Sequence, residues 1–263
     1  MNTSWAAPSA PRGAWTADSA PVASAVASTA TSVTTSYATT VVDTFAGAAT
    51  GSDLTLHVAD SGAEWTRNAV LAGAFVASSA NRVYVPTSTA MYIALGVPPS
   101  SDYTVSATLR ALSSFTDTYA GVAGRMQTAA NTAYFARYEG SAGANGACWA
   151  LYKAVAGSTA LLGTAAEGLS TNSDYVLRLV LAGTSIKFVV NDVTKVSATD
   201  SAITLAGYGG LRATVVVTQT DSTGLHLADF SVRGFVGETS VSVTTAAAWS
   251  AATLRPASWS TRT

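Results

Sequence analysis

The chain has 263 residues, a net charge of −1 at neutral pH, and only 11% charged residues. A net charge near zero excludes general electrostatic attraction to nucleic acid or to an anionic membrane. The charged fraction is less than half of that usual in soluble proteins, which leaves two interpretations: a secreted β-rich protein, or a subunit largely covered by neighbours. The single cysteine, Cys148, excludes an internal disulfide and a thiolate metal cluster. No run approaches the roughly 18 apolar residues of a membrane span, so we expect no membrane insertion.

Residues 1–40 consist mainly of small and β-branched residues, and we predict that they form an extended N-terminal arm. Residues 237–263 are predicted to form a C-terminal arm. Each arm carries two tryptophans ten positions apart, namely Trp5 and Trp15, and Trp249 and Trp259. An extended arm has no core in which to bury an indole, and tryptophans in pockets are common energetic centres of interfaces. We therefore expect these tryptophans to dock onto partners, with packing onto their own domain as the alternative.

Residues 41–236 are predicted to form one all-β domain. We expect strands or hairpins, in chain order, at 41–45, 69–77, 82–86, 91–95, 103–112, 119–126, 133–140, 148–155, 175–192, 195–199, 209–213 and 225–235. So many short strands without a convincing amphipathic helix favour an antiparallel two-sheet sandwich or jelly roll. The clearest pattern is the hairpin at 175–192, where alternating apolar residues flank a turn at 182–185.

Two segments that bracket this domain resemble a known family. The opening VVDTFAGAATGSDLTLHVADSGAEW is similar to laminin-G/concanavalin-A-like jelly-roll domains of bacterial and phage proteins, and the endings GYGGLRA and LADFSV match them as well. The resemblance implies a concanavalin/laminin-G-like jelly roll in which the first and last strands pair side by side. The matching residues are Asp43, Phe45, Leu54, His57, Asp60, Gly62 and Trp65 at the start, and Gly210, Leu211, Asp229 and Phe230 at the end.

The resemblance, the low charge and the arms together suggest a component of a tailed-phage virion, of minor tail or head-decoration type, whose jelly roll contacts glycan on a host surface. Its partners would then be other virion proteins bound through the arms, in a homo-oligomeric or multi-copy assembly. The N-terminal residues lack a basic segment followed by an apolar run, so we expect assembly in a host cytoplasm and location in the virion. One alternative is a free extracellular carbohydrate-binding module or glycoside hydrolase of the same fold. Another is a purely structural capsid protein without a ligand.

Catalysis is not expected. Glycosidases of this fold place two carboxylates on one strand in a pattern like E-x-D-x-E, and no such pattern occurs. Asp43 and Asp229 lie on the two bracketing strands and so come close in the predicted fold, but we expect structural roles for both. His57 is expected to be a hydrogen-bonded turn residue rather than a base. No cofactor or metal is expected, and a calcium ion at a loop remains open because some relatives hold one.

A carbohydrate site is the most specific chemistry that the pattern suggests. Strand alternation predicts that Arg110, Arg125, Arg137 and Tyr152 project from the polar face of neighbouring strands. Arginine donors beside an aromatic ring suit sugars or anionic polymers. The alternative is a solvated sheet face with long side chains.

Overall fold

The computed structural model describes residues 33–240 except residues 69, 97, 99 and 129, and of residues 33–38 and 236–240 it describes only the backbone. Val33–Thr239 form one compact unit. Trp5, Trp15, Trp249 and Trp259 lie outside the described residues, so their docking remains a prediction. The proposed boundaries between arms and domain also remain predictions.

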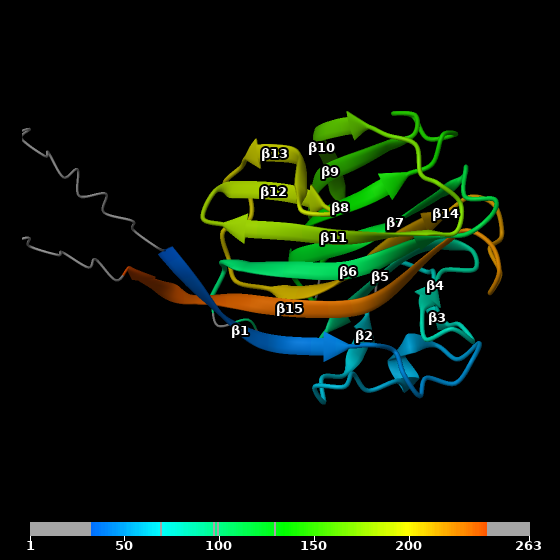
Figure 1. Ribbon diagram of the computed structural model, residues 1–263, viewed down its shortest axis with the longest axis horizontal. Helices are drawn as coiled ribbons and strands as arrows, with labels where there is room; N and C mark the ends of the chain where they lie inside the picture. The colour runs from blue at the N-terminus through cyan, green and yellow to red at the C-terminus, as the bar shows by residue number, and fades with distance from the viewer. Residues whose placement is uncertain (1–32, 69, 97, 99, 129, 241–263) are drawn as a thin grey trace, which may run out of the picture. The chain divides into compact units, whose positions relative to one another are not determined.

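The described residues fold into two antiparallel β-sheets that face each other (Figure 1). This confirms the predicted all-β two-sheet sandwich. The eight-stranded sheet contains, in spatial order, β13 (Val193–Thr199), β12 (Ser185–Val190), β11 (Ser173–Ala182), β6 (Tyr103–Ala111), β15 (Leu225–Ser240), β4 (Val83–Tyr84) and β3 (Val76–Ala77), with β1 (Val33–Asp43) also paired to β15. The seven-stranded sheet contains β10 (Ser158–Ala166), β9 (Cys148–Val155), β8 (Ala133–Glu139), β7 (Thr118–Met126), β14 (Tyr208–Val215), β5 (Ser88–Ala94) and β2 (Trp65–Arg67).

The first and last strands lie side by side, as the family resemblance implied (Figure 1). At the end of β1, the buried carboxylate of Asp43 joins three residues that the matching motif contains. Its Oδ2 accepts a hydrogen bond from Trp65 Nε1 at 2.6 Å, and its Oδ1 accepts from the backbone N–H of Phe45 at 2.7 Å and lies 2.9 Å from His57 Nε2. The motif therefore encodes a buried polar junction that fixes where β1 ends.

The core between the sheets follows from strand alternation, in which every second side chain points to the same face. The predicted hairpin is confirmed: β11 and β12 are joined by a two-residue turn, and their apolar residues Leu177, Leu179, Leu181, Ile186, Phe188 and Val190 are all buried. Trp149 of β9 is fully buried between the sheets, with its ring 5.1 Å from Tyr138 and 5.7 Å from Phe188. These contacts connect the two layers.

One long strand, β10, is absent from the predicted elements. It forms the edge of the seven-stranded sheet, and most of its residues are exposed or only partly buried. Its pairing with β9 is interrupted by an irregularity between Leu161 and Gly163. An exposed edge strand with small residues lacks the apolar alternation on which the prediction depends.

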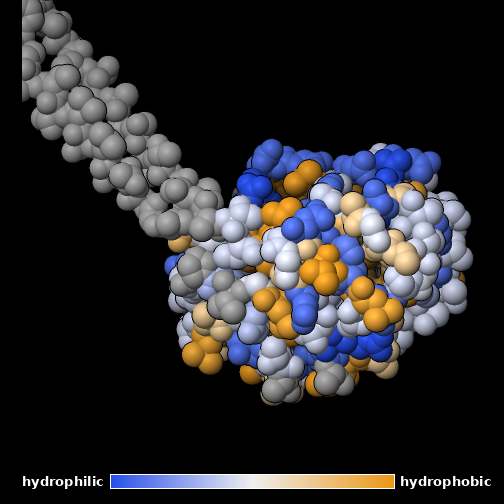
Figure 2. All heavy atoms as spheres, turned by 90° about the horizontal axis from the view of Figure 1, so that it is seen from below, coloured by the Kyte–Doolittle hydropathy of each residue, from blue (hydrophilic) through white to orange (hydrophobic). Residues whose placement is uncertain are grey.

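Figure 2 views the protein from the side on which β1 and β2 lie and shows hydrophobic groups separated by polar ones. Leu56, the last residue of the short 3-10 helix η1 (Leu54–Leu56), is 80% exposed, and Val58, which follows the helix, is 56% exposed. Among the described residues, no helix has the length and hydropathy that crossing a bilayer requires.

Candidate functional site

The structure separates the four residues predicted for a carbohydrate site. Arg137 and Tyr152 lie on the outer face of the seven-stranded sheet, on the adjacent strands β8 and β9. Arg110 lies on the outer face of the opposite sheet, where it forms an ion pair of 3.1 Å with Asp174 of β11. Arg125 points into the sandwich and is 1% exposed. Only Arg137 and Tyr152 are therefore brought together.

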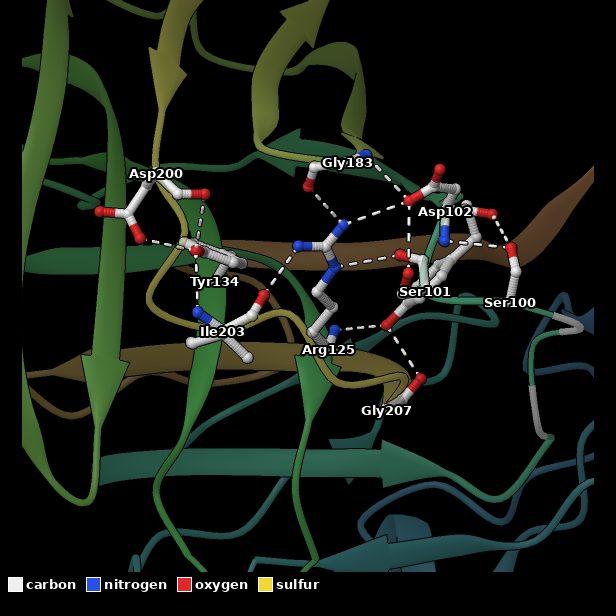
Figure 3. A network of polar contacts seen from close by, with 10 residues as sticks. Ser100, Ser101, Asp102, Arg125, Tyr134, Gly183, Asp200, Ile203 and Gly207 are labelled. Atoms are coloured by element: carbon white, nitrogen blue, oxygen red, sulfur yellow. Dashed lines mark hydrogen bonds and ion pairs between the residues drawn. The ribbon is translucent and has the colours of Figure 1, made fainter.

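Arg125 joins three loops at one end of the sandwich (Figure 3). Its guanidinium donates hydrogen bonds to the carbonyl oxygens of Ser101 at 3.0 Å, Ile203 at 2.7 Å and Gly183 at 2.8 Å. The carboxylate of Asp102 lies 3.4 Å from Nη2. Because its donors are used inside the protein, Arg125 has a structural role and is not placed to contact a ligand.

Arg137 and Tyr152 belong to a polar cluster that is largely satisfied within the protein. The Arg137 guanidinium lies 4.9 Å from the centre of the Tyr152 ring and donates to Glu139 Oε1 at 2.7 Å. Glu139 also accepts hydrogen bonds from the Tyr152 hydroxyl at 2.6 Å and from Asn145 at 2.8 Å. Burial, reinforced by the bond to Glu139, raises the pKa of Tyr152 to about 12. The cluster leaves few free groups for a ligand.

The opposite sheet carries an open hollow on its outer face, which we call the β6 groove. It has a volume of about 550 Å³ and runs across β11, β6 and β15, which lie side by side in Figure 1. This volume falls in the range of small-molecule sites, roughly 300–1,000 Å³. Its side chains are those of Thr104, Ser106, Ala107, Thr108, Val176, Arg178, Val180, Asp229, Ser231, Arg233 and Phe235.

The registers of the three strands explain how the groove forms. Thr104, Ser106 and Thr108 alternate with buried residues along β6, so their short hydroxyl-bearing side chains make the floor. Ser106 lies opposite Arg178 of β11 on one side and Ser231 of β15 on the other. Thr104 lies opposite Arg233 in the same way. Short side chains between long ones hollow the surface along β6.

A β-bulge completes the groove on the β15 side. The pairing of β15 with β6 shifts between Ala228 and Ser231, and Asp229 takes a positive φ of 49° at this point. Bulges redirect side chains and are common beside binding sites. The exposed Asp229 borders the β6 groove and also a smaller adjoining hollow of about 240 Å³, which includes Arg82 and Asp174.

The charges around the β6 groove differ in their pairing. Arg178 forms an ion pair with Asp192 at 2.5 Å. Among the described residues, neither Asp229 nor Arg233 has an ion pair, and both are exposed. The groove therefore offers one free carboxylate and one free guanidinium beside a row of hydroxyl groups.

Asp43 and Asp229, which the predicted fold brings close, have different surroundings in the structure. Asp43 is fully buried in the junction with Trp65, whereas Asp229 is exposed at the groove. Within residues 33–240 and their gaps, no group of three or more His, Cys, Asp or Glu side chains is arranged to hold a metal ion.

No protein-family model and no curated protein matches the sequence. Among solved structures, a Bacillus subtilis protein of unknown function with a galectin-like fold aligns with a TM-score of 0.50 at 12% identity, over 70% of this chain and 96% of that chain. The chain has a galectin-like jelly-roll fold. The carbohydrate-binding module CBM66 from Bacillus subtilis aligns with a TM-score of 0.48 at 16% identity, over 65% of this chain and 92% of that one. The carbohydrate recognition domain of Emp47p aligns with a TM-score of 0.49 at 10% identity, over 71% of this chain and 95% of that chain.

Sequence reasoning missed the residues that distinguish the groove. Alternation along β6 places Thr104, Ser106 and Thr108 on the same polar face as Arg110, which was predicted for the carbohydrate site. Asp229 and Arg233 were not assigned to that face, because the bulge in β15 changes the alternation at this point. The short polar side chains of β6 were the available signal, since they predict a hollow wherever long side chains flank them.

Proposed function

We propose that this protein is a non-enzymatic carbohydrate-binding β-sandwich, and that the β6 groove binds a neutral saccharide. The observation that carries the proposal is the open 550 Å³ groove, with its hydroxyl floor and the free Asp229 and Arg233 at its β15 side. The fold resemblance had implied glycan contact through the jelly roll, and the groove supplies a place for it.

The chemistry of the groove suits a sugar better than most other ligands. A saccharide presents many hydroxyl groups, each of which both donates and accepts hydrogen bonds. Asp229 offers an acceptor and Arg233 offers donors, and bonds to charged partners are the stronger ones. Val176, Val180 and Phe235 add apolar surface along the same groove, as in typical ligand sites.

The free charges also favour a neutral saccharide over a charged one. One unpaired carboxylate and one unpaired guanidinium sum to zero, so neither an anion nor a cation gains net attraction. A shallow groove on a sheet face gives modest affinity for one site. Multivalent display of the saccharide therefore improves detection.

The experiment is a glycan array of neutral and acidic oligosaccharides probed with the full chain. Asp229→Asn removes the charge but keeps a residue type that tolerates a positive φ. Arg233→Gln removes the guanidinium, and Ser106→Phe fills the floor of the groove. Lys187→Gln is the control matched to Arg233→Gln, because it removes one positive charge from an exposed residue of β12 that does not line the groove.

We expect the native chain to bind neutral oligosaccharides. The Asp229 and Arg233 variants should each bind about tenfold more weakly or worse, the loss of roughly one charge-assisted hydrogen bond, and Ser106→Phe should reduce binding at least as much because its ring occupies the groove. The Lys187 variant should bind as the native chain does. Absence of binding to every neutral saccharide, or equal binding by the groove variants, would refute the proposal.

This proposal follows the alternative given in the sequence analysis, a carbohydrate-binding module, rather than the virion component. The role in a phage virion, with partners bound through the arms, gains no support from the similar structures named above. It remains a prediction from the sequence, and so does location in a virion.

A further inference from the structure

Arg212 of β14 is a buried cation on the outer face of the seven-stranded sheet, the face opposite to the β6 groove. It is 7% exposed. In the sheet it lies between Met91 of β5 and Gly121 of β7. Because Gly121 has no side chain, the guanidinium extends across β7 and lies 4.1 Å from the centre of the Phe135 ring on β8.

Only one side of this guanidinium has partners among the described residues. Nη1 donates to Asn131 Oδ1 at 2.9 Å and lies 3.6 Å from the sulfur of Met91. Nε is buried without an acceptor, and the structure gives Nη2 no acceptor within the described part of the chain. The Nε and Nη2 edge of arginine is one of the forks that bind the two oxygens of a carboxylate side by side.

Within the part of the chain that the structure describes, the positive charge of Arg212 has no compensating carboxylate. The described residues give Arg212 no ion pair, and the nearby Arg137 is already bound to Glu139. Glu139 accepts from Arg137, Tyr152 and Asn145, so its oxygens are occupied. Burial, together with repulsion from Arg137, lowers the pKa of Arg212 to about 10. Buried charges are normally paired, and an unpaired one is costly.

We propose that the Nε and Nη2 edge of Arg212 binds a carboxylate and, resting on the carbohydrate binding proposed above, that this carboxylate belongs to an acidic saccharide, so that the seven-stranded sheet carries a second binding site. A carboxylate would supply both missing acceptors and the missing negative charge at once. Met91 and Phe135 belong to a buried apolar cluster on this face, and the partly buried side chains of Leu71 and Tyr208 pack against that cluster. This site is independent of the β6 groove, since the two lie on the outer faces of different sheets.

The test follows thermal unfolding of the full chain with three probes: oligogalacturonate, a neutral galacto-oligosaccharide, and acetate at the same carboxylate concentration. We expect oligogalacturonate to raise the melting temperature of the native chain in a concentration-dependent way, because it binds only the folded state. The neutral saccharide binds at the β6 groove, so its effect on the melting temperature should be the same in the Arg212 variants as in the native chain.

Arg212→Met keeps the length of the side chain and removes the charge. This variant removes the uncompensated buried charge but also the hydrogen bond to Asn131 Oδ1, so the two effects on stability oppose each other and the variant should still fold in buffer. It should lose the response to oligogalacturonate. Arg212→Lys keeps the charge without the fork and should bind about tenfold more weakly. Arg233→Gln, in the groove, should respond as the native chain does.

Three results would overturn the inference. The native chain could show no response to oligogalacturonate, or the Arg212→Met variant could respond equally. Equal stabilisation by acetate would overturn the assignment to a saccharide. If the groove proposal is wrong, the Arg233 and Asp229 variants bind neutral saccharides as the native chain does, but the response of the Arg212 variants to oligogalacturonate is unaffected. The two proposals can therefore fail separately.

Discussion

The buried junction around Asp43 allows a stability prediction of known size. Asp43→Ala removes the acceptor for the indole N–H of Trp65 and for the backbone N–H of Phe45, and both donors stay buried. An unsatisfied buried donor costs about 1–3 kcal/mol, so the two donors that this variant leaves cost about 4 kcal/mol together. We therefore expect the free energy of unfolding to fall by about 3–5 kcal/mol.

Urea unfolding of the full chain, followed by tryptophan fluorescence, measures this change. With a slope of about 2 kcal/mol per M urea, the midpoint should fall by about 1.5–2.5 M. Asp60→Ala is the matched control, because exposed Asp60 accepts from the backbone N–H and hydroxyl of Thr44 at 2.9 and 2.7 Å near the same strand end. Its loss should cost only about 1 kcal/mol. Equal urea midpoints for the two variants would refute the view that burial of the Asp43 junction determines how much it contributes to the free energy of unfolding.

Two further predictions concern pH. Burial opposes ionisation of Glu139, but hydrogen bonds from Tyr152, Asn145 and Arg137 outweigh it and hold the pKa of Glu139 below its usual 4.5. Its contribution to stability is therefore complete above pH 4.5 and is lost as the pH falls through the lowered pKa, so Glu139→Gln should flatten the decline of the urea midpoint below pH 4.5. Burial lowers the pKa of His226 below 6.5 despite its hydrogen bonds to the carbonyls of Thr220 and Thr223. The neutral ring is thus favoured in the folded state, and stability should decline as the pH falls below 6.5. His226→Phe, which keeps an aromatic ring against Tyr84, should remove this part of the decline, and an unchanged profile would contradict the assignment.

Alternation of apolar and polar residues was sufficient to predict the sandwich, because burial of one face of each strand is a local property. The hairpin of β11 and β12 shows this, since all six of its alternating apolar residues are buried. The pairing of β1 with β15 is a long-range contact. It was predicted only through the resemblance, on the motif that contains Asp43 and Trp65.

Two irregularities explain why the candidate site was predicted less well. Alternation from Ala123 places Arg125 on the outer face, but the register of β7 against β14 shifts between Tyr208 and Gly210, and Arg125 takes a positive φ of 49°. Its side chain therefore turns into the sandwich. The bulge at Asp229 has the same effect on β15, where it creates the border of the groove. Bulges depend on tertiary contacts, so a period of two cannot reveal them.

The scarcity of charge in this chain makes its unpaired charges informative. Only 11% of the residues are charged, and the described residues form eight ion pairs, which use most of their buried or half-buried charges. Arg125 and Glu139 are buried and ion-paired, and buried Asp43 accepts hydrogen bonds from Trp65 and Phe45. Within the described ranges, Arg212 is thus the buried charged side chain whose charge has no such partner. A composition that otherwise avoids charge has kept a cation where its cost is highest. Since that cost is removed only by an anion, the Arg212 site should be the one at which ligand charge decides binding, and the β6 groove the one at which hydroxyl geometry decides it.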